Sequence, residues 1–403
     1  MTTARPAAPD ATDAPALVPL HCLRHAEPGP PRQAALPTGT PVWLVTRHGD
    51  VRQVLTDPRL DRASLYAPGA PAVSLTPNLL DDPQALLNLD GEEHRRLRRT
   101  VQRAFTPRAI ARWRPWVASV VDGLLDELEK SGSPADVIAG FSRPLPVAVI
   151  SRLMGLDGLD LQRLGHWSDH ALSAGAHTAE EIGAAMREFG EFGGKLVAER
   201  RAAPGDDLVS SLVEAADHTE GVTPQQLVSL VCGLVVAGHE TTMTSLGNAI
   251  VHVLSEGRDS WPRIAGSEEQ AALAAEQLLR AVPLGDGTAL PGLLRRAVED
   301  VEIGGVLIPA GSVVAADGAA ANHDPSVYPE DVPLFEPLGT PSLTFGAGPH
   351  HCLGAWLARM ELELALHRLA VRFPTLRLTG PLEAVEWRRG LLTRSPLRLE
   401  VAW

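Results

Sequence analysis

Apolar residues recur with helical spacing along several stretches of the chain. Residues 223–226, Thr-Pro-Gln-Gln, form a capping box with proline at the first helical position, so a long apolar helix is expected to begin there. Two further helices are expected, one over residues 110–128 and one just after residue 352. The apolar residues of the former are Ile110, Trp113, Val117, Val120, Leu124 and Leu128. Those of the latter, mostly on one buried face, are Leu353, Trp356, Leu357, Met360, Leu362, Leu364 and Leu366.

Strand-like segments are short. Residues 42–45, Val-Trp-Leu-Val, predict a strand that leads into a helix, and residues 301–314, with Gly304-Gly305, predict a hairpin. Prolines and glycines interrupt residues 62–90 and 323–341, which are therefore expected to be irregular. The pattern predicts a mainly α fold with small β-sheets.

The length of the chain leaves its domain organisation open. Its 403 residues exceed the ~250–300 at which a single core usually stops growing, which would favour two domains. No serine- or glycine-rich linker divides the sequence, however, so residues 35–403 are expected to form one domain. Residues 1–34 begin with a stretch rich in alanine, proline and threonine and are expected to be a flexible N-terminal segment.

Composition and charge exclude several classes of protein. A net charge of −13 argues against a general nucleic-acid-binding protein. Three cysteines, at positions 22, 232 and 352, are too few and too scattered for a disulfide framework, which favours a reducing cytoplasm. The first residues do not resemble a signal peptide. The longest apolar run, residues 227–238, is shorter than the ~18–20 residues that span a bilayer, so no membrane anchor is expected.

One glycine-rich loop carries the most specific chemistry. Residues 345–355 read Phe-Gly-Ala-Gly-Pro-His-His-Cys-Leu-Gly-Ala and place Cys352 just before an apolar helix. A thiol at a helix N-terminus meets unpaired N–H groups and the positive end of the helix dipole, and both favour a metal-binding thiolate. Gly346, Gly348 and Gly354 let the backbone turn tightly and let a flat cofactor approach it.

This loop resembles, position by position, the haem-binding signature of the cytochromes P450: Phe, two residues, Gly, three residues, Cys, one residue, Gly. The resemblance extends from about residue 35 to the end of the chain. It implies the cytochrome P450 fold, with haem b between the long central helix and the cysteine-loop helix. Cys352 would be the axial ligand of the haem iron, and Phe345, Gly346 and Gly354 would lie against the cofactor.

A second motif lies inside the predicted long helix. Residues 237–242 read Ala-Gly-His-Glu-Thr-Thr, and polar groups at such an apolar position are costly unless paired or hydrated. The segment matches the family's oxygen-activation motif, in which an acid and then an alcohol supply protons. The resemblance makes Glu240 the acid and Thr241 the alcohol, with Thr242 as a weaker candidate, and places Ala237 and Gly238 beside the haem. The alternative is a helix kink with a satisfied polar cluster.

The resemblance also assigns residues to the haem propionates. His94 and Arg98 share one helix face and have the spacing with which the family holds a propionate. Arg295 and His350 match two further propionate positions, whereas Ser342 stands where the family often has another histidine. Two interpretations are open for arginines 95, 96, 99 and 103: a basic face exposed to solvent, or part of a docking surface for an acidic electron donor. We prefer the docking surface.

The chain departs from the family's Glu-x-x-Arg motif. Gln277 stands where the glutamate belongs, three residues before Arg280, and Glu276 lies about 100° away round the helix. The arginine that usually completes this set is also missing, because the segment runs on to Gly339. We expect Gln277 to accept one hydrogen bond from Arg280, whose other donors would meet backbone carbonyls of residues 330–341. A glutamate at position 277 is expected to add a small stabilisation through a charge-assisted pair.

The resemblance implies a soluble, monomeric bacterial-type monooxygenase that hydroxylates a small molecule, as in the tailoring of secondary metabolites. The chain has no flavin or nucleotide fingerprint, so electrons are expected from NAD(P)H through a ferredoxin and a ferredoxin reductase. The expected pocket walls are residues 62–90, 165–185, 236–241, 282–293 and 391–392. Their mostly apolar character favours a neutral, largely apolar substrate over an ionic one.

Three alternative functions remain open. The same fold can catalyse oxidative coupling of aromatic rings. A peroxide-driven enzyme is disfavoured by Glu240 and Thr241, since such members tend to lack the acid–alcohol pair. A haem-binding protein without catalysis is suggested by the altered Glu-x-x-Arg motif.

Overall fold

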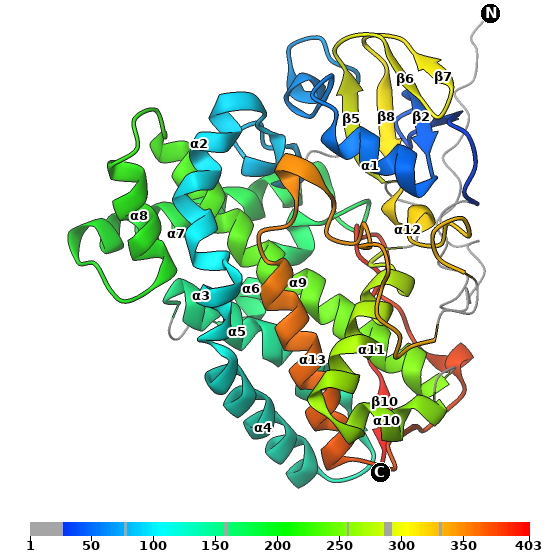
Figure 1. The fold of residues 1–403 in the computed structure, drawn as a ribbon. Helices are drawn as coiled ribbons and strands as arrows, with labels where there is room; N and C mark the ends of the chain where they lie inside the picture. The colour runs from blue at the N-terminus through cyan, green and yellow to red at the C-terminus, as the bar shows by residue number, and fades with distance from the viewer. Residues whose placement is uncertain (1–26, 76–78, 157–159, 256–257, 286–291, 330–332) are drawn as a thin grey trace, which may run out of the picture.

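The computed structural model describes residues 27–75, 79–156, 160–255, 258–285, 292–329 and 333–403. A large helical part and a smaller β-rich part lie side by side (Figure 1). The helices are α1 His48–Thr56, α2 Gly91–Val101, α3 Pro107–Ala111, α4 Arg114–Ser131, α5 Pro144–Met154, α6 Leu161–Ala171, α7 Ala179–Ala202, α8 Leu208–Asp217, α9 Pro224–Ser255, α10 Trp261–Gly266, α11 Glu268–Ala281, α12 Gly318–Ala321 and α13 Ala355–Arg372. The strands are β1 Arg32–Ala35, β2 Pro41–Val45, β3 Leu60–Asp61, β4 Ala135–Asp136, β5 Leu293–Ala297, β6 Val301–Ile303, β7 Val306–Ile308, β8 Val313–Ala316, β9 Arg377–Leu378 and β10 Glu400–Ala402.

The long helix α9 runs through the helical part and packs against α5, α7 and α13 (Figure 1). Its predicted capping box is confirmed: the Thr223 N–H donates to Oε1 of Gln226, and the Gln226 N–H donates to Oγ1 of Thr223, both at 3.1 Å. By length and composition α9 could cross a membrane, but 67% of its apolar 18-residue window is buried inside the protein. Its apolar character is therefore that of a core helix.

Helix α13 follows the cysteine loop and packs against α11, α10 and α4. Most of its predicted apolar face is buried, but the prediction is wrong for Trp356, which is 49% exposed. Farther along, α13 buries the consecutive residues 360–362 and 364–366, so the exposure of Trp356 belongs to the first turn of the helix.

The predicted helix over residues 110–128 is in fact two helices, α3 and α4, with a turn between them. Thr106 caps α3 by accepting a hydrogen bond from the Ala109 N–H, and Pro115 stands in the first turn of α4, where its missing N–H costs nothing. The break shifts the phase of the apolar face. Val120 and Leu124, expected in the core, are only half-buried. The buried residues of α4 are Val117, Val121, Leu125 and Leu128.

The β-rich part is a five-stranded sheet of order β1-β2-β8-β5-β3, beside the two-stranded hairpin β6-β7. The predicted strand at residues 42–45 is confirmed. The hairpin predicted over residues 301–314 forms over residues 301–308 and turns at Gly304 and Gly305, whose φ angles are positive, whereas residues 313 and 314 belong to β8 of the five-stranded sheet. A separate three-stranded sheet, β4-β10-β9, holds the C-terminus. Residues 32–34 belong to β1, which corrects the expectation of a flexible segment there, whereas residues 1–26 lie outside the described residues.

The two segments expected to be irregular contain only short 3-10 helices and turns among their described residues. Residues 62–90 hold 3-10 helices at Ala63–Tyr66, Leu79–Asp81 and Leu86–Asn88. That residues 35–403 form a single domain stays a prediction.

Candidate functional site

The cysteine loop owes its shape to glycine. The Cys352 N–H donates to the carbonyl of Phe345 at 2.9 Å, which closes the loop. Gly346 and Gly348 have φ angles of 70° and 69°, a conformation that other residues rarely adopt. A Cβ on Gly348 would also lie 2.8 Å from the carbonyl oxygen of Leu55 in α1. The loop therefore places Cys352 just before α13, as predicted.

The environment of the Cys352 thiol acts on its charge in two opposite directions. Burial raises the pKa of this thiol, while the N–H groups of Gly354 and Ala355 and the cations Arg98 and Arg359 lower it. The N–H groups at the start of the helix thus lower the pKa of the Cys352 thiol, as the sequence predicts, but desolvation raises this pKa by more. A stable thiolate here requires a cation at the sulfur, which a metal supplies.

Beside this loop the structure brings together the four residues predicted to hold the propionates. His94 and Arg98 come from α2, Arg295 from β5 and His350 from the 3-10 helix Gly348–His350. The rings of His94 and His350 are 4.2 Å apart between centroids. Arg98 donates to the carbonyl of His351 at 2.5 Å, and Arg295 is near enough to His350 to lower its pKa.

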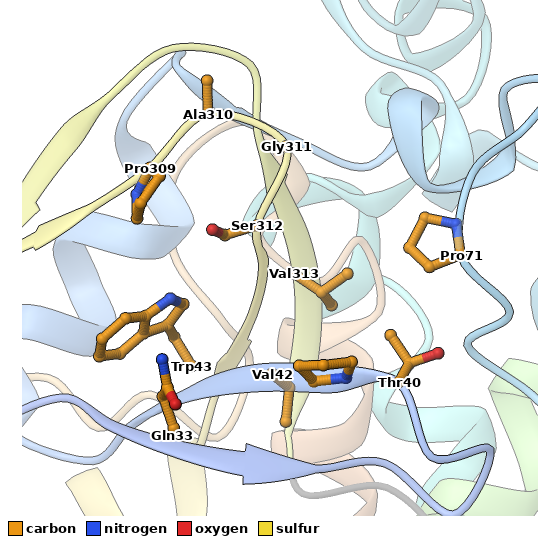
Figure 2. A pocket seen from close by; sticks show the side chains of 11 residues that line it. Gln33, Thr40, Val42, Trp43, Pro71, Pro309, Ala310, Gly311, Ser312 and Val313 are labelled. Atoms are coloured by element: carbon orange, nitrogen blue, oxygen red, sulfur yellow. The ribbon is translucent and has the colours of Figure 1, made fainter.

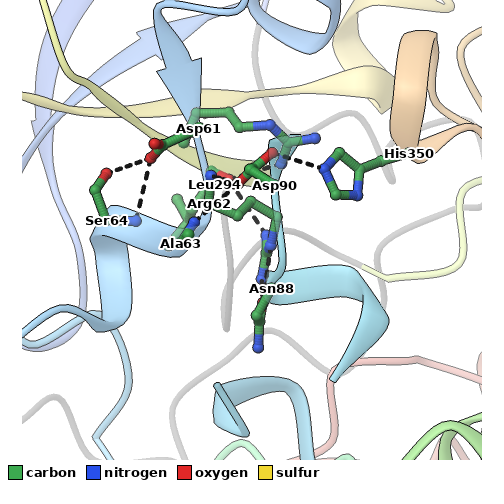
Figure 3. Close-up of polar contacts among 9 residues, drawn as sticks. Asp61, Arg62, Ala63, Ser64, Asn88, Asp90, Leu294 and His350 are labelled. Atoms are coloured by element: carbon green, nitrogen blue, oxygen red, sulfur yellow. Dashed lines mark hydrogen bonds and ion pairs between the residues drawn. The ribbon is translucent and has the colours of Figure 1, made fainter. Parts of the chain in front are cut away.

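Two further residues of this cluster were not predicted. Asp90 lies with one carboxylate oxygen 3.0 Å from Nε2 of His350, while its other oxygen accepts the N–H groups of Arg62 and Ala63 (Figure 3). The Arg62 guanidinium donates to the side-chain oxygen of Asn88 at 2.8 and 3.0 Å. Asp90 and His350 are 260 residues apart, so no local spacing could have paired them.

The cluster has the charge of an anion-binding site. Burial, together with the neighbouring His350 and Arg98, lowers the pKa of His94 to about 4, and burial together with Arg62 lowers that of Arg295 to about 10. Nε2 of His94 is buried and has no hydrogen-bond partner among the described residues. The buried guanidinium groups of Arg62 and Arg295, which Asp90 offsets in part, favour the arrival of further negative charge. The two carboxylates of a haem, held next to a cysteine, fit these residues.

The polar segment of α9 presents its residues in different directions. Ala237 is exposed and Thr241 half-exposed, and the Thr241 hydroxyl donates to the Ala237 carbonyl at 2.9 Å. Thr242 is buried. At Gly238 a Cβ would lie 2.6 Å from Cδ1 of Ile150 in α5, so this glycine also allows the close packing of α5 on α9.

Glu240 is buried in a polar network that the sequence did not reveal. Its Oε1 accepts hydrogen bonds from Arg388 at 2.5 Å and from the hydroxyl of Thr393 at 3.1 Å. Arg388 also pairs with Asp169 at the end of α6. Glu240 is thus satisfied by a C-terminal loop, Thr241 within the helix, and His239 by the Val235 carbonyl and the Ser168 hydroxyl of α6.

The altered Glu-x-x-Arg motif is confirmed in one respect and corrected in another. Oε1 of Gln277 accepts a hydrogen bond from Nε of Arg280 at 3.0 Å, as expected. Nη1 of Arg280 donates to the carbonyl of Asn322 at 2.8 Å, which lies outside the expected segment 330–341. Gln277 itself reaches that segment, because its Nε2 donates to the carbonyl of Glu336 at 2.7 Å. Glu276 pairs instead with Arg359.

Three of the predicted pocket walls meet. Ser173 pairs with Leu391 in a β-bridge, and Leu392 donates to the carbonyl of Leu172 at 2.9 Å. The backbone N–H of Arg394 donates to the carbonyl of Leu284 at 2.7 Å, while residues 286–291 lie outside the described residues. These walls also carry more charge than expected, which qualifies the prediction of a neutral substrate. Residues 165–185 include Asp169, which pairs with Arg388, and three neighbouring histidines. The rings of His170 and His177 are stacked, and that of His166 is tilted against His170.

A hollow of about 450 Å³ lies elsewhere, between β1, β2 and residues 309–313 (Figure 2). Trp43, Pro71 and Pro309 line it together with Gln33 and Val313. Because its lining has no titratable side chain and none of the predicted site residues, we assign the chemistry to the cysteine loop.

Comparison with known proteins agrees with this assignment. Residues 287–401 match the family model for cytochrome P450. Nocardicin C N-oxygenase of Nocardia uniformis subsp. tsuyamanensis is 43% identical over 378 residues, 93% of this chain and 92% of that protein. Mycinamicin IV hydroxylase/epoxidase of Micromonospora griseorubida is 42% identical, covering 91% of each chain. A crystal structure of a cytochrome P450 with biaryl coupling reactivity superimposes with a TM-score of 0.85 at 36% identity, covering 93% of each chain. The cysteine loop and the cationic cluster fit the haem cofactor of these proteins. The chain belongs to the cytochrome P450 family of haem-thiolate monooxygenases.

Proposed function

We propose that this cytochrome P450 tailors a small secondary metabolite by hydroxylation, with Cys352 as the axial ligand of the haem iron. The cluster of His94, Arg98, Arg295 and His350 beside Cys352 is the observation that carries the assignment, since its two arginines and the unpaired Nε2 of His94 suit the propionates. Bound haem supplies the activation of dioxygen, favoured by electron donation from the thiolate. The further residues assigned to the haem surface are Phe345, Gly346, Gly354, Ala237 and Gly238.

Thr241 and Glu240 are assigned to proton supply. The half-exposed Thr241 stands on the accessible side of α9, next to the exposed Ala237. The Thr241 hydroxyl can reorient from the Ala237 carbonyl to carry a proton. Glu240 is the nearest carboxylate along the helix, and general acid–base help of this kind is worth roughly 10²–10⁴-fold in rate. Buried Thr242 is the weaker candidate.

The substrate is proposed to be a small molecule with both apolar and polar parts. The relatives named for nocardicin C and mycinamicin IV support a small-molecule substrate. Leu391 and Leu392 supply apolar wall, and Asp169 with Arg388 supplies charge that a wholly apolar substrate would not need.

The protein is proposed to act as a monomer in the cytoplasm. Its electrons are proposed to come from NAD(P)H through a ferredoxin reductase and a ferredoxin. Trp356 is exposed beside the cysteine loop, and the Arg359 guanidinium lies 4.5 Å from the ring centroid of Phe345 and 5.4 Å from that of Trp356. Exposed Arg95 and Arg99 on α2 share the carboxylate of Glu92. An exposed aromatic ring with an arginine beside it suits an acidic partner.

Oxidative aromatic coupling is the second candidate, supported by the structural neighbour with biaryl coupling reactivity. A screen of metabolite scaffolds for a spectral shift of the ferric haem would identify binders. Turnover of each binder with ferredoxin, reductase and NADPH under ¹⁸O₂ then separates the candidates. Hydroxylation adds one labelled oxygen atom to the product, whereas coupling joins two molecules and adds none. Normal haem binding without any turnover would contradict both.

A further inference from the structure

A second hollow, of about 140 Å³, lies beside the altered Glu-x-x-Arg motif. It is bounded by α9, by the 3-10 helix Arg258–Ser260, by the C-terminal end of α11 and by Leu334. The residues that line it are His252, Val253, Ser260, Gln277, Leu278, Arg280, Ala281 and Leu334. The lining thus combines apolar side chains with one guanidinium, and these eight residues include no carboxylate.

Arg280 is buried at this hollow, only 8% exposed, and its hydrogen-bond acceptors are neutral. Nε donates to the side chain of Gln277 at 3.0 Å and Nη1 donates to the Asn322 carbonyl at 2.8 Å, whereas Nη2 donates to no acceptor among the residues that the structure describes. The ring centroid of Tyr328 lies 5.1 Å from the guanidinium carbon, and burial raises the pKa of this phenol to about 12, so it is uncharged. The described neighbours of Arg280 therefore leave its positive charge unbalanced.

The imbalance comes from the residue that replaces the family's glutamate. A carboxylate at position 277 would offset the charge of Arg280, but the amide of Gln277 does not, and its nitrogen is held by the Glu336 carbonyl. Glu276, the preceding carboxylate, is paired with Arg359 instead. Burying a charge without a counterion is costly. A negative ion that enters the hollow from solution would therefore stabilise the folded protein.

We propose that this hollow binds a small monovalent anion of the size of chloride, whose charge replaces that of the missing carboxylate beside Arg280. Nη2 of Arg280 supplies a charge-assisted hydrogen bond, and the half-buried hydroxyl of Ser260 in the same lining supplies a second donor. One guanidinium balances one negative charge, which favours a monovalent over a divalent anion. A water molecule takes about 30 Å³ in the liquid, so the hollow has room for such an ion together with water.

Two measurements on the holoprotein test the site. In crystals grown with sodium bromide, anomalous scattering should place a bromide ion in the hollow, within hydrogen-bonding distance of Nη2 of Arg280. In solution, replacing gluconate by chloride at constant ionic strength should raise the melting temperature by about 2–4 °C, because an ion that binds only the folded state stabilises it.

Three variants separate this site from general salt effects. Gln277→Glu supplies a carboxylate from within the protein, and Leu334→Phe fills the hollow but keeps Arg280, so each should abolish the response to chloride. If one of the two does not fold, the other decides. Glu276→Gln is the matched control, since it removes a carboxylate of the same helix outside the lining and should keep the response.

Three results would overturn the proposal. The first is water alone in the hollow of the bromide crystals. The second is an equal response to chloride in the wild type and in Leu334→Phe, which would place the anion elsewhere on the protein. The third is a bromide peak without any response to chloride in solution, which would mean binding at crystal concentration only.

Discussion

Gln277 and Arg280 lie one helical turn apart in α11, and the amide oxygen of Gln277 accepts a 3.0 Å hydrogen bond from Nε of Arg280. The amide nitrogen of Gln277 meanwhile donates to the Glu336 carbonyl at 2.7 Å. A neutral side chain thus uses both its acceptor and its donor where the family usually has a carboxylate. The expectation that a glutamate would stabilise this site stays untested, but the second hydrogen bond of Gln277 argues against it.

Gln277→Glu should lower the free energy of unfolding by about 1–3 kcal/mol. The carboxylate would gain a charge-assisted bond to Arg280, but it would lose the donor to Glu336 and place two acceptors in contact within a buried site. Urea unfolding of the holoprotein measures the change. Glu276→Gln is the control: it breaks a partly exposed pair with Arg359 and should cost about 1 kcal/mol or less. A more stable Gln277→Glu would show that the pairing with Arg280 dominates.

Cys352→His should abolish the red-shifted Soret band of the ferrous–CO complex, since only a thiolate ligand produces it. Cys232→Ala should keep that band, because Cys232 is buried against Phe189 in the helical core. Absorption spectra of the two reduced variants under CO test the assignment. A wild-type spectrum typical of histidine-ligated haem would overturn it.

Thr241→Ala should leave substrate binding intact but divert reducing equivalents into hydrogen peroxide. Glu240→Gln should slow turnover by roughly 10²-fold or more through the loss of a proton-exchanging group. Peroxide and product formed per NADPH measure both effects. Thr242→Ala serves as the control, because this neighbouring threonine is buried and Thr241 is not. If Thr242→Ala also diverts reducing equivalents into hydrogen peroxide, the proton route passes through the buried face of α9.

The stability of the haem-free protein should fall as the pH drops from about 6.5 towards 4, because of His94. In that range the unfolded chain binds a proton at His94 that the folded chain, with its lowered pKa, does not bind. The free energy of unfolding then decreases by up to about 3 kcal/mol. Urea unfolding across this pH range measures the slope, and His94→Gln should reduce it by this amount. Haem-loaded protein should show a smaller slope, since a propionate next to His94 raises its pKa.

Trp356→Ala should raise the ferredoxin concentration needed for half-maximal reduction about tenfold, as expected for an interface anchor worth ~1–2 kcal/mol. Haem spectra should not change. The control is Val371→Ala, an apolar residue of α13 that is 55% exposed near its C-terminal end. If Trp356→Ala changes the required ferredoxin concentration no more than Val371→Ala does, the docking surface lies elsewhere.

Local signals in the sequence determined much of the fold. The capping box at Thr223, the turn at Gly304-Gly305 and the glycine pattern before Cys352 each act through backbone groups only a few residues apart. Such signals survive without knowledge of the tertiary contacts. The signature of the cysteine loop is also a local signal, since it lies within eleven consecutive residues, 345–355, and it therefore identified the family from the sequence.

Tertiary packing decided which polar groups that are distant in the sequence meet. Asp90 pairs with His350 across 260 residues and Arg388 with Glu240 across 148, and neither Asp90 nor Arg388 stands in a distinctive local pattern. Packing also decided that Ile150 fills the space at Gly238 and that Trp356 remains exposed. The physical reason is that burial and charge pairing depend on which distant surfaces come together, whereas helix and turn signals depend on the chain's immediate neighbours.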